Sequence, residues 1–236
     1  MTDSMNSSAI ALVTGATSGI GRAIAQRLLA EGFTVYGIGR NPAAAPVHPA
    51  FHMLPVDLTD AVAAENAVRP IAGKLSLLVN AAGVAYYGPH ETLSPSAIAE
   101  MVDVNVKAPL LLTNIVLPHL RECAGTIVNI SSVTAKQGNN THGCAYGATK
   151  AAMSNFSESL FAECRKHGVR VITLHPDLTD TALYRNADFT PVDDPEYSLQ
   201  ADEVADFAWQ AISARDGLVV TDITVRPQRN GIKRNS

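Results

Sequence analysis

Two side chains with complementary chemistry, Tyr146 and Lys150, stand four residues apart, a spacing that places both on one face of an α-helix. Upstream of them, Ile130-Ser131-Ser132 ends an apolar run. Near the start of the chain, Thr14-Gly15-Ala16-Thr17-Ser18-Gly19-Ile20-Gly21 forms a glycine-rich turn between an apolar run and a helical pattern. Together these three stretches predict hydride transfer.

Reducing a carbonyl group requires hydride at the carbon and a proton at the oxygen, so such a site needs a general acid. The ordinary pKa of a tyrosine, near ~10, is too high for easy proton exchange at neutral pH. An ammonium at about 4 Å and an effective dielectric of about 20 stabilises a phenolate by roughly 4 kcal/mol, or about three pKa units. We therefore expect the pKa of Tyr146 to lie near neutrality if Lys150 is that close. The alternative is an exposed helix pair.

The glycine-rich turn has the context of a dinucleotide site. Gly15, Gly19 and Gly21 directly follow an apolar run and precede a helical pattern. Glycine lets the backbone approach a pyrophosphate, and the N-terminus of the helix supplies free N–H groups. The alternative is an ordinary tight turn. Asn80-Ala81-Ala82-Gly83, at the end of a later apolar run, favours the dinucleotide site.

These motifs, in this order, resemble those of short-chain dehydrogenases/reductases, in the branch with a Thr-Gly-x-x-x-Gly-x-Gly turn and a Tyr-x-x-x-Lys active site. The resemblance covers nearly the whole chain. It implies that Tyr146 is the acid in reduction and the base in oxidation. It further implies that Lys150 lowers the Tyr146 pKa and holds the nicotinamide ribose, and that Ser132 binds the substrate oxygen. Asn105 matches the asparagine that supports a proton-relay water, with a purely structural asparagine as the alternative. We choose Ser132 over Ser131 because the family spacing fits it and because neighbours on a strand point in opposite directions.

The end of the second apolar run can distinguish NAD from NADP, because NAD enzymes place a carboxylate there. Here the chain reads Gly37-Ile38-Gly39-Arg40-Asn41, and Arg40 could bind a 2′-phosphate as a planar fork. We therefore expect NADP(H) to be preferred over NAD(H); the alternative is an Arg40 that faces solvent. Asp57-Leu58 matches the family position that contacts adenine, although Asp57 could also cap a helix. The full set of predicted cofactor contacts is Gly15, Thr17, Ser18, Gly19, Ile20, Gly21, Arg40, Asn41, Asp57, Leu58, Asn80, Ala81, Ala82, Gly83, Tyr146, Lys150, Pro176, Thr179 and Thr181.

The chain departs from the family pattern in two places. Where the family has Pro-Gly, then Val or Ile, and then Thr, this chain reads Pro176-Asp177-Leu178-Thr179-Asp180-Thr181, so that Asp177 replaces the glycine. This change brings a carboxylate toward the mouth of the active site. The family's Asp-Gly-Gly near the C-terminus is replaced by Thr224-Val225-Arg226-Pro227-Gln228, which weakens the family as a guide to subunit packing.

Apolar runs alternate with helical patterns along the chain. We expect a helix over Ile20–Glu31, with Gly32 beyond its end, and another that begins after Ser94 with Pro95 in its first turn. The alternation predicts one α/β domain over residues 1–236, a Rossmann-like doubly wound parallel sheet of about seven strands with helices on both faces. The expected strands are Ile10–Val13, Thr34–Ile38, His52–Val56, Leu75–Val79, Thr126–Ile130, Val169–Leu174 and Leu218–Val225.

Three segments stand outside this alternation. Residues 175–199 carry prolines and aspartates but no long helical pattern, so we expect a substrate loop or lid, or alternatively a plain surface connection. Residues 1–8 are expected to be disordered. Residues 227–236 are expected to form a tail, and the basic cluster Arg226, Arg229, Lys233 and Arg234 would be solvated or would contact a subunit. The expected pocket walls are Tyr86, Tyr87, Val133, Gln137, Asn139, Asn140, His142 and Tyr184.

The composition excludes several function classes. A net charge of -4 without a long Lys/Arg run argues against nucleic acid and anionic membranes as partners. Cys123, Cys144 and Cys164 show no metal-ligand pairing and suit a reducing compartment, although Cys144 could line the pocket. Met1–Ser8 lacks the apolar region of a secretory signal, and no run reaches the ~18 apolar residues of a membrane span. We therefore expect a cytoplasmic protein without a metal.

The sequence thus predicts an NADPH-dependent carbonyl reductase or secondary alcohol dehydrogenase that acts on a small-molecule ketone or alcohol. One alternative is a polyol or hydroxysteroid dehydrogenase that works oxidatively. The other is a weakly catalytic nucleotide-binding regulator, against which the complete set Asn105, Ser132, Tyr146 and Lys150 argues, because binding alone needs no proton donor. The resemblance also implies a homodimer or homotetramer that associates through the helix bearing Tyr146.

Overall fold

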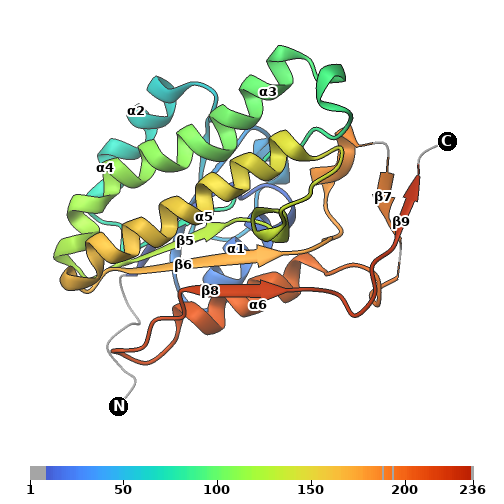
Figure 1. Ribbon diagram of the computed structural model, residues 1–236. Helices are drawn as coiled ribbons and strands as arrows, with labels where there is room; N and C mark the ends of the chain where they lie inside the picture. Colours follow the sequence, from blue (N-terminus) through green and yellow to red (C-terminus); the bar gives the residue numbers. More distant parts are fainter. Residues whose placement is uncertain (1–8, 188, 193, 235–236) are drawn as a thin grey trace.

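The computed structural model describes residues 9–187, 189–192 and 194–234, so the prediction for residues 1–8 lies outside the described part of the chain. Its centre is a seven-stranded sheet in the order β3-β2-β1-β4-β5-β6-β8, with every neighbouring pair parallel (Figure 1). The strands are β1 Ile10–Thr14, β2 Thr34–Gly39, β3 Phe51–Pro55, β4 Leu77–Asn80, β5 Thr126–Ile130, β6 Arg170–Pro176 and β8 Asp222–Val225. The predicted Rossmann-like α/β fold is confirmed.

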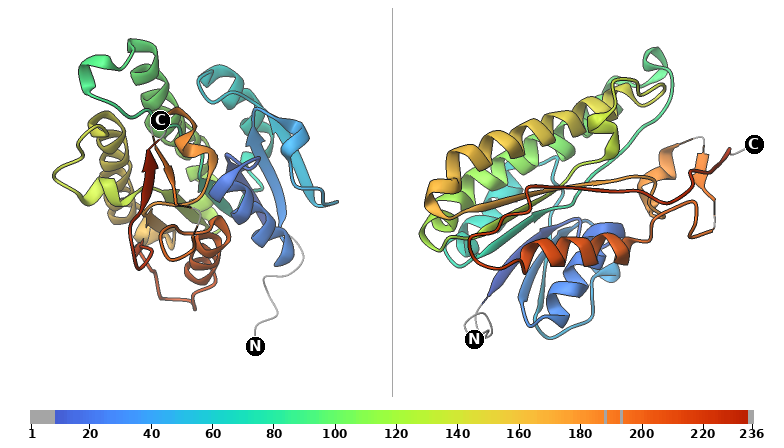
Figure 2. Two further views of the ribbon diagram at one scale, coloured as in Figure 1. Left: turned by 90° about the vertical axis from the view of Figure 1, so that its right-hand side faces the viewer. Right: turned by 60° about the horizontal axis from the view of Figure 1, so that its bottom comes forward.

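Helices cover both faces of the sheet, because its strands carry apolar side chains on both sides. The α-helices are α1 Gly19–Ala30, α2 Ala61–Ala72, α3 Pro95–Val102, α4 Ala108–Glu122, α5 Cys144–Cys164 and α6 Ala201–Ile212. α1 and α6 cover one face, and α2, α4 and α5 cover the other (Figure 2). Alternation along β1 fits this arrangement, because Ala11 and Val13 belong to the core under α1 and α6 whereas Leu12 belongs to the opposite core.

One helical run, Pro95–Glu122, consists of α3, a π-helical turn at Asp103–Lys107 and α4. Among the described residues it is the one helix that is long and apolar enough to cross a membrane by those two criteria. Leu112, Val116 and Leu120 of this run are fully buried in the core on one face of the sheet. Packing against the sheet therefore accounts for its apolar character.

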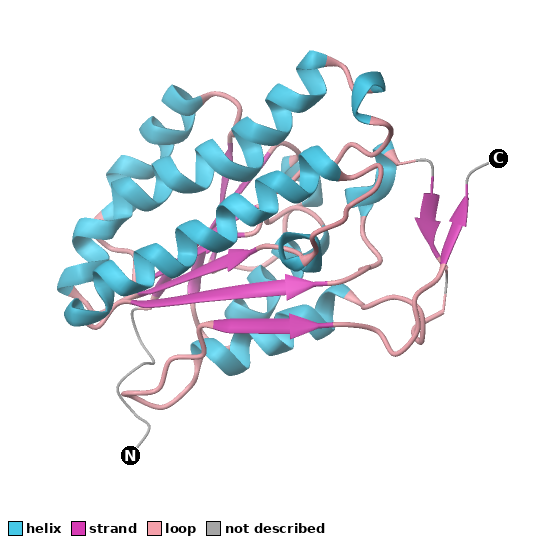
Figure 3. Ribbon diagram, in the orientation of Figure 1, coloured by secondary structure: helices cyan, strands magenta, loops and turns pink. Residues whose placement is uncertain are grey.

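The C-terminal segment, for which we expected a tail, is folded as far as Arg234. β9 Ile232–Arg234 pairs antiparallel with β7 Phe189–Pro191, and this small sheet stands apart from the main one (Figure 3). Gly231 lies so close to Tyr197 that a Cβ atom would meet its ring at 2.6 Å. Arg229 pairs with Glu196 at 3.4 Å. The C-terminus thus packs against the 175–199 segment, through contacts between distant residues that local periodicity does not reveal.

Candidate active site

A cleft of about 430 Å³ opens at the carboxyl ends of the strands, where the strand order reverses between β1 and β4. Ligands of doubly wound sheets bind at this point. Among the predicted site residues, those that line the cleft are Gly15, Thr17, Ser18, Gly19, Ile20, Gly21, Arg40, Asn41, Asp57, Leu58, Ala81, Ala82, Gly83, Ser132, Tyr146, Lys150, Pro176, Thr179 and Thr181. The fold therefore brings together three motifs that are far apart in the sequence.

The glycine-rich turn packs directly on the end of β4. A Cβ atom at Gly15, whose φ is +70°, would lie 2.9 Å from the Ala82 Cα, and one at Gly21 would lie 2.5 Å from the Gly15 carbonyl oxygen. Ser18 is the N-cap of α1 but makes no side-chain capping bond. The first N–H groups of α1 are therefore available to an anion in the cleft, as a pyrophosphate-binding turn requires.

Asn80 is the predicted cofactor contact that the structure turns away from the cleft. Its side chain is 3% exposed and donates to Asn129 Oδ1 at 2.8 Å, within the sheet. The hydroxyl of Thr14 instead holds this end of β4, because it accepts hydrogen bonds from the N–H groups of Ala81 and Ala82, each at 3.0 Å. Asn80 thus links β4 to β5 beneath the cleft and does not line it.

Tyr146 and Lys150 form a buried pair, not the exposed helix pair that was the alternative. The two residues are 3% and 5% exposed, and the Lys150 Nζ lies 5.7 Å from the centroid of the Tyr146 ring. The ammonium donates to the carbonyl oxygen of Ile130 at 2.9 Å, its one protein acceptor among the described residues. Since an ammonium has three hydrogens, two remain for oxygens of a ligand, and a nicotinamide ribose would fit this donor.

Our expectation of a Tyr146 pKa near neutrality is wrong for this structure. Burial raises the pKa of the phenol, the neighbouring Tyr184 raises it further, and a hydrogen bond with Ser132 lowers it. Burial also lowers the pKa of Lys150 to about 8. Desolvation by burial is the largest cause of both shifts.

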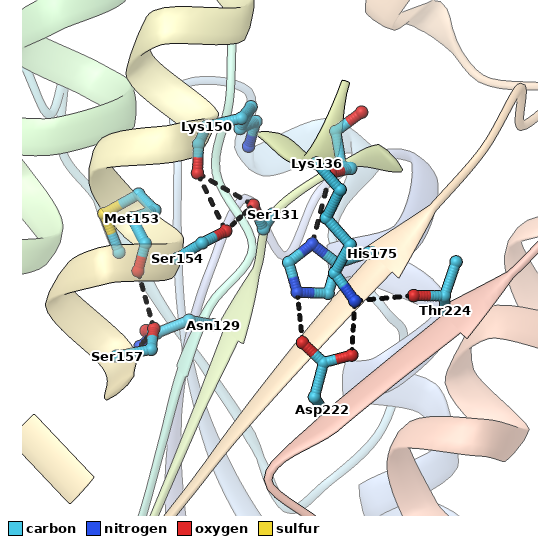
Figure 4. Close-up of polar contacts among 11 residues, drawn as sticks. Asn129, Ser131, Lys136, Lys150, Met153, Ser154, Ser157, His175, Asp222 and Thr224 are labelled. Atoms are coloured by element: carbon cyan, nitrogen blue, oxygen red, sulfur yellow. Dashed lines mark hydrogen bonds and ion pairs between the residues drawn. The ribbon is translucent and has the colours of Figure 1, made fainter. Parts of the chain in front are cut away.

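The two adjacent serines point to different partners. The Ser131 hydroxyl donates to the backbone carbonyl oxygen of Lys150 at 2.9 Å and lies 2.8 Å from the Ser154 hydroxyl (Figure 4). Ser132 contacts Tyr146 and accepts a hydrogen bond from the N–H of Thr134 at 3.2 Å. Ser131 is thus occupied by α5, and Ser132 is the serine placed beside the phenol.

Asn105 lies behind the cleft, in the π-helical turn. Its Oδ1 accepts from the N–H of Val84 at 2.9 Å, and its Nδ2 donates to the Val84 carbonyl at 2.9 Å and to the Thr149 hydroxyl at 3.0 Å. Both amide hydrogens are therefore used within the protein. A Cβ atom at Gly83 would lie 3.5 Å from both Asn105 and the Lys150 Nζ, so this asparagine fixes the backbone next to the ammonium.

The other end of the cleft carries a cation and a carboxylate. The side chain of Arg40 is 56% exposed, and its Nη1 lies 3.6 Å from Glu100 Oε1. Asp57 accepts from the N–H and the hydroxyl of Thr59 at 3.0 and 2.9 Å, and the backbone bond from Thr59 lowers its pKa. Asp57 thus caps a local turn at Thr59, and the residue that caps helix α2 is Asp60. Our alternative, in which Asp57 caps a helix, is therefore wrong.

The Asp177 carboxylate lines the cleft but is held by its neighbours. One oxygen accepts from the N–H of Leu178 at 2.9 Å, and the other lies 3.8 Å from the Nε of Arg226. Arg226 is therefore paired rather than simply solvated. Thr181 approaches the glycine-rich turn so closely that a Cβ atom at Gly19 would meet its methyl carbon at 3.1 Å.

The predicted pocket walls are only partly correct. Tyr184 lines the cleft, and Tyr87 reaches it indirectly by packing on Tyr146 and Tyr184, with ring centroids 5.7 and 6.1 Å apart. Residues that do not line it are Tyr86, Val133, Gln137, Asn139, Asn140, His142 and Cys144. The prediction missed Leu183 and Arg185, which line the cleft from a 3₁₀ turn at Ala182–Asn186. Only their closeness to Tyr184 in the sequence could have indicated them.

Comparison with known proteins agrees with this geometry. The profile of the short chain dehydrogenase family matches residues 9–190. Serine 3-dehydrogenase of Agrobacterium fabrum is 32% identical over 92% of each chain, and an uncharacterized oxidoreductase of Staphylococcus epidermidis is 30% identical over 92% of this chain and 96% of its own. A short chain dehydrogenase from Burkholderia cenocepacia, solved in complex with NADP, has a TM-score of 0.84 at 28% identity and covers 95% of this chain and 98% of its own.

A second solved structure, 3-ketoacyl-(acyl-carrier-protein) reductase from Brucella melitensis complexed with NADH, has a TM-score of 0.83 at 25% identity over 96% of this chain and 99% of its own. The chain belongs to the short-chain dehydrogenase/reductase family, as its motifs predicted. It is an oxidoreductase that uses a nicotinamide cofactor.

Replacing the buried amine should stabilise the protein while it abolishes turnover. The pKa of Lys150 is 10.5 unfolded and about 8 folded, so the unfolded state binds more protons between these pH values. The free energy of unfolding therefore rises between about pH 8 and 10.5, and below pH 8 it is reduced by on the order of 3 kcal/mol. In Lys150→Met this pH dependence should be flattened and the free energy of unfolding at neutral pH increased.

Denaturant unfolding at several pH values measures this difference. Lys74→Met, at an exposed position, is the matched control and should change the free energy of unfolding by less than about 0.5 kcal/mol. A Lys150→Met protein that is less stable than the wild type at neutral pH would show that burial of the ammonium does not lower the free energy of unfolding.

Proposed function

We propose that this protein is an NADPH-dependent carbonyl reductase that reversibly converts a ketone to a secondary alcohol, with Tyr146 as general acid and base. The observation that carries the proposal is the placement of a buried phenol beside Ser132 and Lys150, in the same cleft as the glycine-rich turn. A nucleotide-binding regulator would need the turn but not the buried phenol and ammonium. The regulator is therefore the weaker interpretation.

The bound nicotinamide supplies or accepts the hydride. The residues of this chain act on the oxygen. The Ser132 hydroxyl donates a hydrogen bond to the substrate carbonyl, which fixes its oxygen next to the Tyr146 phenol. Tyr146 donates its proton to that oxygen, and the charged Lys150 stabilises the phenolate that remains. The cleft's walls keep this exchange away from bulk water, in which these electrostatic effects would be weaker.

The same phenol serves both directions of the reaction, because Tyr146 gives its proton in reduction and its phenolate accepts one in oxidation. The raised pKa of Tyr146 therefore does not choose between the reductase and the polyol or hydroxysteroid dehydrogenase that we gave as the alternative. Rates of NADPH-dependent ketone reduction, compared with rates of NADP⁺-dependent oxidation of polyols and hydroxysteroids, separate the two.

A second candidate is oxidation of a small hydroxy acid. The 32% identity to serine 3-dehydrogenase and the presence of Arg185 in the cleft wall favour it, because a guanidinium can bind a substrate carboxylate. NADP⁺-dependent oxidation of serine, compared with NADPH-dependent reduction of a panel of neutral ketones, separates the two candidates. Faster turnover of the ketones is the result that we expect.

We propose that NADP(H) is preferred over NAD(H). Arg40 follows β2 and lines the cleft, and the nearby Glu100 keeps its guanidinium at the cleft wall. A guanidinium suits a 2′-phosphate through its paired N–H groups.

We further propose that the protein is cytoplasmic and forms a homodimer or homotetramer. The three free cysteines support a reducing compartment, and the family resemblance supports the oligomer.

Tyr146→Phe tests the chemistry. It removes one oxygen from a buried ring, so the fold and the cleft should persist while kcat for ketone reduction falls by about 10²- to 10⁴-fold. Spectrophotometric assay of NADPH consumption measures the loss, and fluorescence titration with NADPH should give a nearly unchanged Kd. Turnover equal to that of the wild type would refute the role of Tyr146.

Arg40→Ala tests the cofactor preference. Loss of charge-assisted hydrogen bonds to the 2′-phosphate should weaken NADPH binding by about tenfold or more and leave NADH binding unchanged. Calorimetric titration with both cofactors measures the two affinities. Arg69→Ala, on the exposed face of α2, is the matched control. If Arg40→Ala binds NADPH as tightly as the wild type does, Arg40 faces solvent and does not select the cofactor.

A further inference from the structure

His175 is a buried histidine that the proposed reaction does not use, although it touches the residue that holds the substrate oxygen. It lies near the carboxyl end of β6 and is 1% exposed. Its Nδ1 is 3.2 Å from the backbone carbonyl oxygen of Ser132. Its Nε2 is 2.9 Å from Oδ2 of Asp222, on the neighbouring strand β8 (Figure 4). The imidazole therefore connects the edge strand of the sheet to the active-site serine.

Asp222 is itself held in place. Its other oxygen, Oδ1, accepts from the Nζ of Lys136 at 2.5 Å, and Lys136 also donates to the Thr224 hydroxyl at 2.8 Å. Lys136 ends a short 3₁₀ helix, Val133–Lys136, for which Ser132 is the N-cap. Polar contacts thus link Ser132 to His175, His175 to Asp222, and Asp222 to Lys136. Lys136 is in turn the last residue of the 3₁₀ helix that Ser132 caps.

Both ring nitrogens of His175 face acceptors. A carbonyl oxygen and a carboxylate oxygen can only accept, so each contact is a hydrogen bond only where the ring nitrogen carries a hydrogen. The charged ring makes both bonds. Burial lowers the pKa of His175, with the Ser132 carbonyl and Asp222 acting against this and Lys136 acting with it. A neutral ring carries one hydrogen, and it can donate to the Ser132 carbonyl only if that hydrogen is on Nδ1.

We propose that His175 is a positioning residue for Ser132: packed between Ser132 and Asp222, it donates from Nδ1 to the Ser132 carbonyl and so fixes the backbone from which the Ser132 hydroxyl projects. The same carbonyl accepts from the N–H of Ala135 at 3.0 Å, so both of its lone pairs are engaged. The Ser132 hydroxyl is attached to the Cβ atom, so the position of the Ser132 backbone determines where the hydroxyl projects. Its direction toward the substrate oxygen therefore depends on a residue on another strand. This role rests on the proposed ketone reduction.

Two substitutions separate positioning from packing. In His175→Asn the amide nitrogen can occupy the place of Nδ1 and keep the bond to Ser132, but it leaves Asp222 and part of the volume unfilled. In His175→Leu the volume is filled by an apolar side chain and the bond is lost. A residue that only packs should tolerate leucine better than asparagine, because a buried polar group with an unmet partner is costly. A positioning residue should show the opposite order in kcat.

The measurements are kcat and the KM for the ketone at saturating NADPH, and the KM for NADPH at saturating ketone, with the thermal midpoint as a check on folding. We expect His175→Leu to lower kcat about tenfold with KM for NADPH unchanged, and His175→Asn to stay within about threefold of the wild type. A His175→Leu kcat within about twofold of the wild type, or a His175→Asn kcat no higher than that of His175→Leu, would overturn the proposal.

A second readout does not depend on turnover. Long-range ¹H–¹⁵N spectra of the imidazoles, assigned by comparison with His175→Asn, report which ring nitrogen carries a hydrogen. We expect a hydrogen on Nδ1 of His175 at neutral pH, and a bare Nδ1 would overturn the inference. If no ketone in the panel is reduced by the wild type, the proposed function fails, whereas the spectra still decide the bond to Ser132.

Discussion

The burial of an ammonium beside a phenol is the constraint on which the rest of the site depends. Lys150 has one protein acceptor among the described residues, the carbonyl oxygen of Ile130, and burial lowers its pKa to about 8. Burial also raises the pKa of Tyr146. The same desolvation thus keeps the proton on the phenol and leaves the amine with unused donors. The lowered pKa of Lys150 is unfavourable for folding at neutral pH, whereas the phenol of Tyr146 is neutral in both the folded and the unfolded state there and costs no stability through its pKa.

The parallel sheet makes this burial possible. Its strands end at one edge, so the turn after β1, the end of β4 and the serines after β5 meet there although they are far apart in the sequence. α5 covers one face of the sheet and presents Tyr146 and Lys150 from one side of the helix toward the cleft. Around this centre the protein adds contacts between distant segments, including the β7–β9 pair and the bond from His175 to Ser132.

Features set by local spacing could be predicted from the sequence, and features set by distant contacts could not. The parallel sheet and the glycine-rich turn follow from alternation and from glycine positions within a few residues. The direction of the Tyr146 pKa shift does not, because it depends on burial and on the neighbouring Tyr184. Asn80 was misassigned because its position at a strand end suggested the cleft, whereas its side chain bonds to Asn129. The contact between His175 and Asp222 depends on the pairing of β6 with β8, which no local pattern shows.

The most direct test of the central claim is an ultraviolet difference titration of the cofactor-free wild type against the Tyr146→Phe protein. The difference spectrum isolates one phenol among the six tyrosines of the chain. We predict that this phenol stays protonated through neutral pH and ionises only above the ordinary value of about 10. A phenolate signal at neutral pH that disappears in Tyr146→Phe would contradict the account, because burial would then not be holding the proton on Tyr146.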